Sequence, residues 1–393
     1  MHMNVRGAEP LRNWGIDCLR GLAILLVVLN HLGLGFRLPL KKSVLMDYLP
    51  TRVLNALSFN GYEAVFIFFV ISGFLIAAKV LSQHPNLQTL YWRTFYQRRA
   101  SRILPLLLAL LAVLALLHGV GFADYRIQAP GQSLGGALFS ALGLHLNWYE
   151  GQTTWLPASW DVLWSLSIEE VFYIGFPIVC LLLPRKLLLA GLVLLALSLP
   201  MTKAALQGNA IWSEKAYLPG MAAIAIGVLT AFTAQHWPRL TGRTARLLLA
   251  LGGVSLVATL VWGQFLDASL HEGYMLVLTL GAAAMVLACH HLCRTALAPR
   301  GLGWLAHMGQ LSYEIYLSHM FVVLSTVALF RHFYAPNLRW DFVVYIPCIG
   351  LCVGLGAALQ RWFTLPCERY LRRIRPVGAV PQSMDQRPIY ERP

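Results

Sequence analysis

Apolar residues run in long blocks along almost the whole chain, and short polar segments separate these blocks. A helix needs about 20 mostly apolar residues to cross a bilayer. We therefore predict an all-α fold, a polytopic transmembrane helical bundle of about ten spans. The candidate spans are residues 14–36, 62–82, 103–122, 163–183, 187–202, 217–234, 245–265, 273–289, 309–330 and 342–364. The run 133–146 is too short for a span and is interpreted as interfacial or re-entrant.

The first block carries three ionisable residues, Asp17, Arg20 and His31. Such groups are costly at membrane depth, so they usually face the protein interior or a wet cavity. The eleven residues from Arg20 to His31 correspond to roughly 20° beyond three helical turns and a rise of roughly 16 Å. This rise is comparable to an extended pantetheine arm, so a cation can hold phosphates while an imidazole meets a thioester. The alternatives are a snorkelling arginine and a packed histidine, and the shared helix face argues against them.

The composition agrees with a membrane protein. Of 393 residues, 58% are hydrophobic and 12% are charged, about half the charged fraction of soluble domains. We expect one membrane domain over residues 14–373, a cytoplasmic N-terminal segment over 1–13 and a flexible cytoplasmic tail over 374–393. The first apolar run lacks a small-residue cleavage site, so we expect no cleavable signal peptide.

The net charge of +14 does not indicate a nucleic-acid partner, because the basic residues cluster in alternate segments between the spans. That pattern predicts cytoplasmic N- and C-termini. Arg98, Arg99 and Arg102 lie where the third span begins, with Arg98 and Arg102 on one face. Arginines at a helix start suit phosphate binding. The alternative is that they set topology and contact lipid headgroups.

Three further spans carry polar residues at helical spacing. Ser72-Gly73 interrupts the bulky run FFVISGFLI, which favours close helix packing or room for a narrow acyl group. Glu169 and Glu170, in WSLSIEEVFY, cannot both face lipid cheaply. Glu169 shares a stripe with two polar residues, and the ninth span carries a second polar stripe that predicts either a polar network or a substrate path. These stripe residues are Ser165 and Tyr173 beside Glu169, and Ser312, Tyr316 and His319 in the ninth span.

The cysteines predict neither a secreted disulfide framework nor a metal site. Seven cysteines lie mainly in apolar runs, where small buried hydrophobes are the default interpretation. The segment from Cys289 to Cys293 includes two histidines but lacks a second ligand pair. We therefore expect no bound metal.

Taken in order, these motifs resemble the acyltransferase 3 family of integral-membrane O-acyltransferases. The resemblance runs from about Trp14 to Arg373. It is carried by Asp17 and Arg20 followed by His31, then by FFVISGFLI, RRASRILP, WSLSIEEVFY, SYEIYLSH and LPCERYLRR. Val171 stands where a glutamine is common, and Asn30 where an aromatic or apolar residue is usual.

The resemblance implies transfer of a short acyl group, often acetyl from acetyl-CoA, to a hydroxyl of a saccharide or lipid-linked glycan. It implies that Arg20 and His31 are essential, that Arg98, Arg99 and Arg102 lie near the donor, and that Glu169 belongs to the site. Some relatives carry a fused hydrolase-like domain, for which we expect no room here. We expect acyl-CoA as co-substrate, no bound cofactor, and a bacterial cytoplasmic (inner) membrane as the location.

The resulting hypothesis places acyl-CoA on the cytoplasmic side, with its arm reaching toward His31 as general base. Glu169 either orients His31 or grips the acceptor. We expect supporting roles for Asp17, Ser72, Ser165, Tyr173, Tyr316 and His319. A covalent acyl-enzyme through Ser72, Ser165 or Ser167 is a less favoured variant.

The alternative function is a transporter or flippase of a lipid-linked glycan that uses the same buried charges as a path. The absence of an obvious internal repeat and the one-sided basic cluster argue against it.

Overall fold

Long helices follow the predicted apolar blocks. The structure is a computed structural model that describes residues 13–36, 40–84, 86–293, 298–333 and 339–374, so the expected flexible tail and nearly all of the N-terminal segment lie outside the described residues. Within this part of the chain there is no β-strand, and nine stretches are long and apolar enough to cross a membrane. They contain α1 (Trp14–Phe36), α3 (Gly61–Gln83), α4 (Trp92–Val120), α8 (Trp164–Leu182), α12 (Tyr217–His236), α13 (Gly242–Leu270), α14 (Gly273–Leu292), α16 (Ser312–Phe333), and α17 (Tyr345–Leu359) with α18 (Leu365–Ile374). The prediction of an all-α, multi-pass membrane protein is confirmed.

Shorter helices connect the spans. They are α2 (Thr51–Phe59), α5 (Leu134–Leu142), α6 (Leu146–Gln152), α7 (Ala158–Asp161), α9 (Arg185–Leu197), α10 (Leu199–Ala204), α11 (Ala210–Lys215) and α15 (Gly303–Gln310). Five short 3-10 segments add single turns at Leu40–Lys42, Val44–Asp47, Leu87–Thr89, Ala123–Tyr125 and Asp341–Val344.

The stretch 187–202 does not form one helix of spanning length, but α9 and α10 together cross the bundle as a broken tenth span. Arg185 at the start of α9 donates to Gln235 at the end of α12, whereas Lys203 at the end of α10 donates to Tyr62 at the start of α3. The chain breaks between α9 and α10 at Ser198, and Pro200 lies in the first turn of α10. Proline is tolerated at a helix start but removes a hydrogen bond from a helix interior. The run 133–146 folds mainly as α5, whose nine residues correspond to roughly 13 Å, too short to cross a bilayer.

The centre of the bundle is the close contact between α3 and α12. A Cβ atom at Gly73 would lie 2.1 Å from the backbone oxygen of Ile224, and one at Gly227 would lie 2.0 Å from that of Val70. Only glycine therefore fits at these two positions without moving a backbone. Of the two roles considered for Ser72-Gly73, Gly73 serves helix packing, as small residues in membrane helices usually do.

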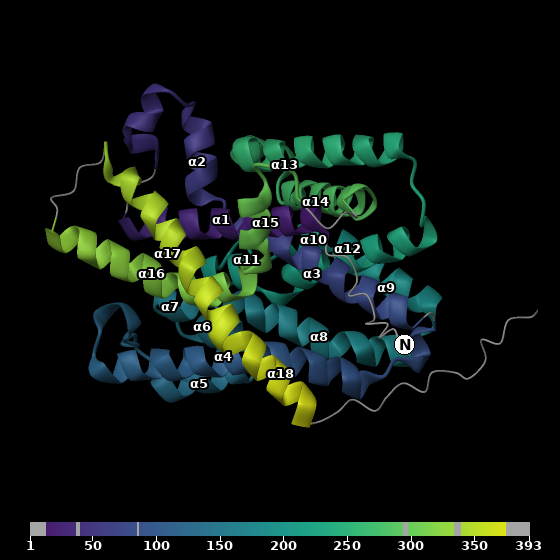
Figure 1. Cartoon of the computed structure of the whole chain (residues 1–393), viewed down its shortest axis with the longest axis horizontal. Coiled ribbons are helices and arrows are strands. Elements are labelled where there is room, and N and C mark those ends of the chain that lie inside the picture. The colour runs from purple at the N-terminus through teal and green to yellow at the C-terminus, as the bar shows by residue number, and fades with distance from the viewer. Residues whose placement is uncertain (1–12, 37–39, 85, 294–297, 334–338, 375–393) are drawn as a thin grey trace, which may run out of the picture.

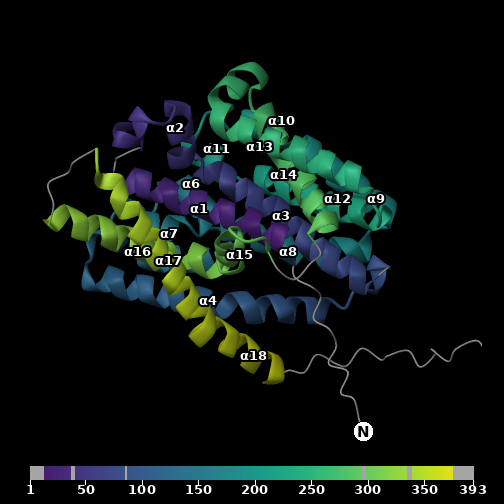
Figure 2. The same ribbon diagram turned by 45° about the horizontal axis from the view of Figure 1, so that its top comes forward.

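Helix α1 lies along this core and contacts α15 and α16, which come from much later in the chain (Figures 1 and 2). A Cβ atom at Gly309 of α15 would lie 1.7 Å from the backbone oxygen of Asp17. Alongside, α1 and α16 run in the same direction, because Arg20 contacts Ser312 near their starts and Arg331 donates to the backbone oxygen of Gly35 near their ends. In Figure 1, α17 and α18 cross diagonally in front of α16 and α4.

A buried charge cluster fixes the loop between α4 and α8. The Lys215 ammonium lies 2.7 Å from Glu150 and also contacts Asp161. Two carboxyl groups share one cation there. Burial, followed by the nearby charge of Asp161, raises the pKa of Glu150 to about 8.

Candidate active site

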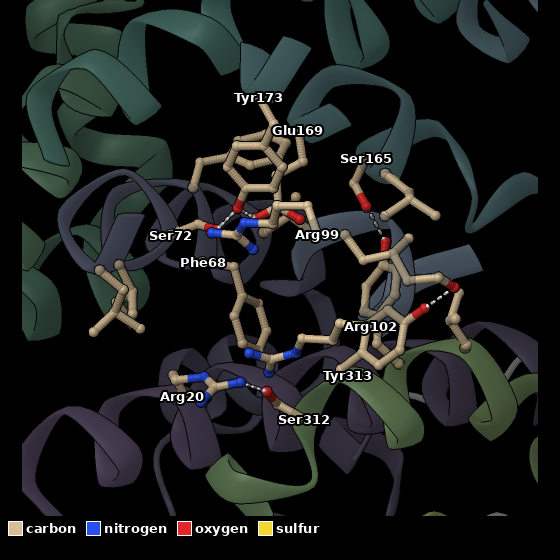
Figure 3. A pocket seen from close by; sticks show the side chains of 18 residues that line it. Arg20, Phe68, Ser72, Arg99, Arg102, Ser165, Glu169, Tyr173, Ser312 and Tyr313 are labelled. Atoms are coloured by element: carbon tan, nitrogen blue, oxygen red, sulfur yellow. Dashed lines mark hydrogen bonds between the residues drawn. The ribbon is translucent and has the colours of Figure 1, made fainter. Parts of the chain in front are cut away.

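Five helices enclose a cavity of about 170 Å³ in the middle of the bundle (Figure 3). Helices α1, α3, α4, α8 and α16 each contribute to its wall. The lining residues are Arg20, Val65, Phe68, Phe69, Ile71, Ser72, Leu75, Arg99, Arg102, Ile103, Ser165, Leu166, Glu169, Tyr173, Ser312, Tyr313, Tyr316 and Leu317. Four of the predicted motifs, far apart in sequence, therefore meet with the start of the first helix around one space.

Arginine side chains form the cationic part of the wall. The guanidinium groups of Arg20, Arg99 and Arg102 border the cavity from α1 and α4 (Figure 3). Arg20 donates a 2.7 Å hydrogen bond to Ser312 Oγ and lies 3.6 Å from Asp17. Asp17 thus supports Arg20 and does not line the cavity itself. The Arg102 side chain is exposed, so the cationic wall reaches the surface of the bundle.

Arg98 lies away from this cavity. Its Nη1 donates a 3.3 Å hydrogen bond to Gln83 Oε1 at the end of α3. The sequence places Arg98 and Arg102 on one face of the helix and predicts all three arginines near the donor, whereas α4 turns Arg99 and Arg102 toward the cavity and leaves Arg98 outside its lining. Both pairs are close in helical angle, so spacing alone could not distinguish them.

Tyr173 is the centre of a polar group on α8 and α3. Its hydroxyl donates a 3.0 Å hydrogen bond to Glu169 Oε1 and makes a second hydrogen bond with Ser72 Oγ. The guanidinium carbon of Arg99 lies 4.1 Å from the centre of the Tyr173 ring, within cation–π range. Ser72 therefore faces the cavity while its neighbour Gly73 packs against α12.

The hydroxyl groups of Ser165 on α8 and Tyr316 on α16 form another polar part of the cavity wall. Ser165 Oγ and the Tyr316 hydroxyl are 2.6 Å apart, and Tyr316 donates a 2.9 Å bond to the backbone oxygen of Val162. The Ser165 hydroxyl must then donate to Tyr316. Sequence reasoning did not select Tyr313, which also lines the cavity and donates to the backbone oxygen of Ile103 across 2.8 Å. Tyr313 could have been selected from the sequence because it directly follows Ser312 in the motif SYEIYLSH.

His31 lies one layer of rings beyond the cavity and is not among its lining residues. Its ring centre is 5.1 Å from that of His319, whose ring in turn lies 5.9 Å from Tyr316, a lining residue. His319 is fully buried, and its Nδ1 lies 2.7 Å from the backbone oxygen of Tyr316. That contact requires a proton on Nδ1. In the neutral ring, Nε2 is then an acceptor, and it has no hydrogen-bond partner among the described residues.

Glu170, the neighbour of Glu169, does not line the cavity, and its buried Oε1 has no hydrogen-bond partner within the described residues. Cys289 and Cys293 pack against Gly15 at the start of α1. No group of three or more histidine, cysteine or acidic residues in the described ranges is arranged to hold a metal ion.

Comparison with known proteins identifies the family. A family model described as an acyltransferase domain, of the acyltransferase 3 type, matches residues 13–359. The chain belongs to the acyltransferase 3 family. The match includes every residue that lines the central cavity, as well as the histidine pair. No solved structure matches the chain at a significant level.

Bacterial relatives of this acyltransferase 3 chain are named as O-acetyltransferases. The peptidoglycan O-acetyltransferase OatA of Listeria monocytogenes is 24% identical over 375 residues, which are 87% of this chain and 54% of that protein. A Bacillus subtilis protein named as a candidate peptidoglycan O-acetyltransferase, YrhL, is 27% identical over 338 residues, 79% of this chain and 49% of that protein. A candidate O-acetyltransferase of Staphylococcus aureus (strain COL) is 24% identical over 379 residues, 90% of this chain and 57% of that protein. The chain thus spans about half the length of the curated relatives it matches.

Proposed function

We propose that this chain is an O-acyltransferase that moves an acyl group, most simply acetyl, from acyl-CoA to a hydroxyl of a saccharide. One observation carries the proposal: three guanidinium groups, from Arg20, Arg99 and Arg102, converge on a cavity inside the bundle. Ionisable groups that face the interior of a membrane bundle usually mark a substrate or ion path. Arginine matches the planar, multidentate geometry of phosphate.

The central cavity is large enough for only one part of the donor. A volume of about 170 Å³ is smaller than most small-molecule sites, so it takes the acyl thioester and the end of the pantetheine arm. The nucleotide phosphates then lie at the exposed Arg102 end. We place this end on the cytoplasmic side, where acyl-CoA is made, together with both chain termini. A bacterial cytoplasmic membrane is the proposed location.

The reaction joins the acceptor oxygen to the acyl carbon and breaks the bond from that carbon to sulfur. His31 takes the proton of the attacking hydroxyl as general base, and that proton then passes to the CoA thiolate. Because the rings of His319 and Tyr316 lie between His31 and the central cavity, this scheme requires the thioester to reach past Tyr316 to meet the hydroxyl. His319 is a positioning residue in this scheme, because its Nε2 can accept a hydrogen bond from one ring nitrogen of His31. The other nitrogen of His31 is then left as the base.

Glu169 belongs to the donor cavity in this scheme. Its carboxylate accepts from Tyr173, which links it to Ser72 and Arg99, so it orders the wall around the thioester. The acceptor reaches His31 from the side opposite the arginines, and the names of the relatives support peptidoglycan or another cell-envelope glycan as that acceptor.

Transfer of label tests the proposal directly. Protein in lipid nanodiscs is incubated with ¹⁴C-acetyl-CoA and a panel of glycans, and the label is expected on a glycan. His31→Ala should abolish transfer, whereas His332→Ala, an exposed histidine on α16, should not. Full transfer by His31→Ala would remove His31 from the mechanism. Glycan movement across proteoliposomes with all label left on CoA would favour the transporter alternative.

A further inference from the structure

A second cavity, of about 550 Å³, lies at the opposite end of α3 from the basic start of α4. It includes Asn60 and Glu63 at the beginning of α3, whereas Gln83 at the end of α3 binds Arg98. The 23 residues of α3 correspond to roughly 34 Å, so the two ends face opposite membrane surfaces. The lining residues are Arg52, Asn55, Ala56, Phe59, Asn60, Glu63, Leu260, Val261, Trp262, Gly263, Gln264, Phe265, Asp267 and Tyr274.

Two buried oxygen atoms of lining residues lack hydrogen-bond partners within the described residues. They are Asn55 Oδ1 and Glu63 Oε2. A buried polar atom without a partner is costly, and most such atoms in native proteins are satisfied. Asn55 Oδ1 is an acceptor, and Glu63 Oε2 is an acceptor while its carboxyl group is ionised. A ligand with hydroxyl or N–H donors would therefore satisfy these buried oxygen atoms.

A break in α13 opens the wall of this cavity. Trp262 leaves helical geometry, with φ −115° and ψ 23°, inside the helix and eight residues before its end. The side-chain amide of Asn60 donates a 2.7 Å hydrogen bond to the backbone oxygen of Leu260, just before the break. The kink is thus held by a residue that itself lines the cavity, and the Trp262 ring is left 43% exposed.

The lining combines aromatic rings with amides and carboxylates. Phe59, Trp262, Phe265 and Tyr274 supply ring faces, on which the C–H faces of sugar rings can stack. One arginine and two carboxylates give the lining a net charge of −1, which disfavours a polyanion such as CoA. A neutral oligosaccharide fits this lining, because its rings can stack on the aromatic side chains and its hydroxyl groups can donate to the buried acceptors. The cavity volume is also within the range of small-molecule sites.

The second cavity and the central cavity flank the same helix. Glu63 lines the second cavity, and Val65, two residues later and about 200° around α3, lines the central cavity, so the two spaces lie on opposite faces of this helix. The Asn30 side chain, next to His31, packs against Gly61 at the start of α3. His31 is therefore at the same end of the bundle as this second cavity.

We propose that the second cavity binds an oligosaccharide segment of the glycan acceptor, which deepens and rests on the proposed acyl transfer. The cavity holds the glycan chain at the membrane surface opposite the donor entrance. A hydroxyl of the same chain then reaches His31.

Binding measured without any donor tests this site separately from the reaction. The probe is a soluble, uncharged β-1,4-linked tetrasaccharide of N-acetylglucosamine, titrated calorimetrically into protein in nanodiscs. Trp262→Ala should weaken binding by about tenfold, the effect of losing about 1.4 kcal/mol. Trp237→Ala, which removes a half-exposed tryptophan from the opposite end of the bundle, should leave binding unchanged.

Asp267→Asn, at an exposed position, provides a second variant that does not depend on repacking a ring, and it should weaken binding severalfold. Equal affinities of wild type, Trp262→Ala and Asp267→Asn, or no binding by wild type, would overturn the proposal. Acetyl transfer that persists with unaltered glycan affinity in both variants would leave the proposed function standing and remove only this site. If the two cavity variants weaken glycan binding but no label is transferred by wild type, the saccharide site would stand and the proposed acyl transfer would be refuted.

Discussion

The guanidinium of Arg99 lies over the ring of Tyr173, so α4 and α8 present a cation and a hydroxyl to the same space. The contact joins two motifs that are 74 positions apart in the sequence. Because Tyr173 also bonds Glu169 and Ser72, it couples the arginine side of the central cavity to its hydroxyl side.

Removal of the cavity arginines should weaken donor binding. Arg99→Ala and Arg102→Ala each remove a charged contact to phosphate, so KM for acetyl-CoA should rise roughly 10- to 100-fold. Arg98→Ala should have a smaller effect, because Arg98 points to Gln83. Steady-state kinetics with varied donor would check this, and an Arg98→Ala defect as large as the others would contradict the geometry.

Tyr173→Phe separates the ring from the hydroxyl. The variant keeps the ring under Arg99 and loses the hydrogen bonds to Glu169 and Ser72. We expect kcat to fall by about tenfold, a typical cost for hydrogen bonds to a charged group, with a smaller change in KM for acetyl-CoA. Unchanged kinetics would mean that the hydroxyl group has no part in the reaction.

His319→Phe keeps a buried ring beside His31 but removes the acceptor nitrogen. We expect kcat to fall by at least about tenfold and the acidic limb of the kcat–pH profile to move, with KM for acetyl-CoA unchanged. His319→Gln, which restores a polar side chain, should recover part of the rate. A matched His332→Phe substitution on the same helix should change neither quantity, and a loss of rate with no movement of the pH profile would indicate a purely structural role.

The helix contact at Gly73 should tolerate no side chain. Gly73→Ala would place a Cβ atom 2.1 Å from a backbone oxygen of α12, so we expect a loss of folded protein or a lower Tm. Gly119→Ala, where nothing lies within 4 Å, should be neutral or slightly stabilising. Size-exclusion profiles and thermal melts in detergent would check both variants.

The raised pKa of Glu150 predicts a pH-dependent stability. The carboxyl binds a proton in the folded state up to about pH 8, whereas in the unfolded chain it loses that proton near its ordinary pKa of 4.5. Between these values the folded state binds more protons, so stability falls as pH rises. Thermal melts of Glu150→Gln should show a weaker decline from pH 5 to 8 than wild type, and parallel profiles would contradict the assignment.

Much of this architecture was accessible from the sequence, because lipid requires long apolar helices and makes internal charges conspicuous. Arg20 and Glu169 were selected for that reason, and Tyr316 for its place on a polar stripe; all three line one cavity. The rotation of α4 was not accessible, since Arg98 and Arg99 differ by one position and only packing decides which faces inward. The ring layer that separates His31 from the cavity also depends on the contact of α1 with α16, which no local pattern encodes.

The alignment of α1 with α16 has a consequence for biosynthesis. Arg20 and His31 leave the ribosome about 290 residues before their partners Ser312 and His319. Helix α1 must therefore stay in the bilayer without these two contacts until α16 inserts. Nascent chains arrested before α16 emerges lack the completed centre.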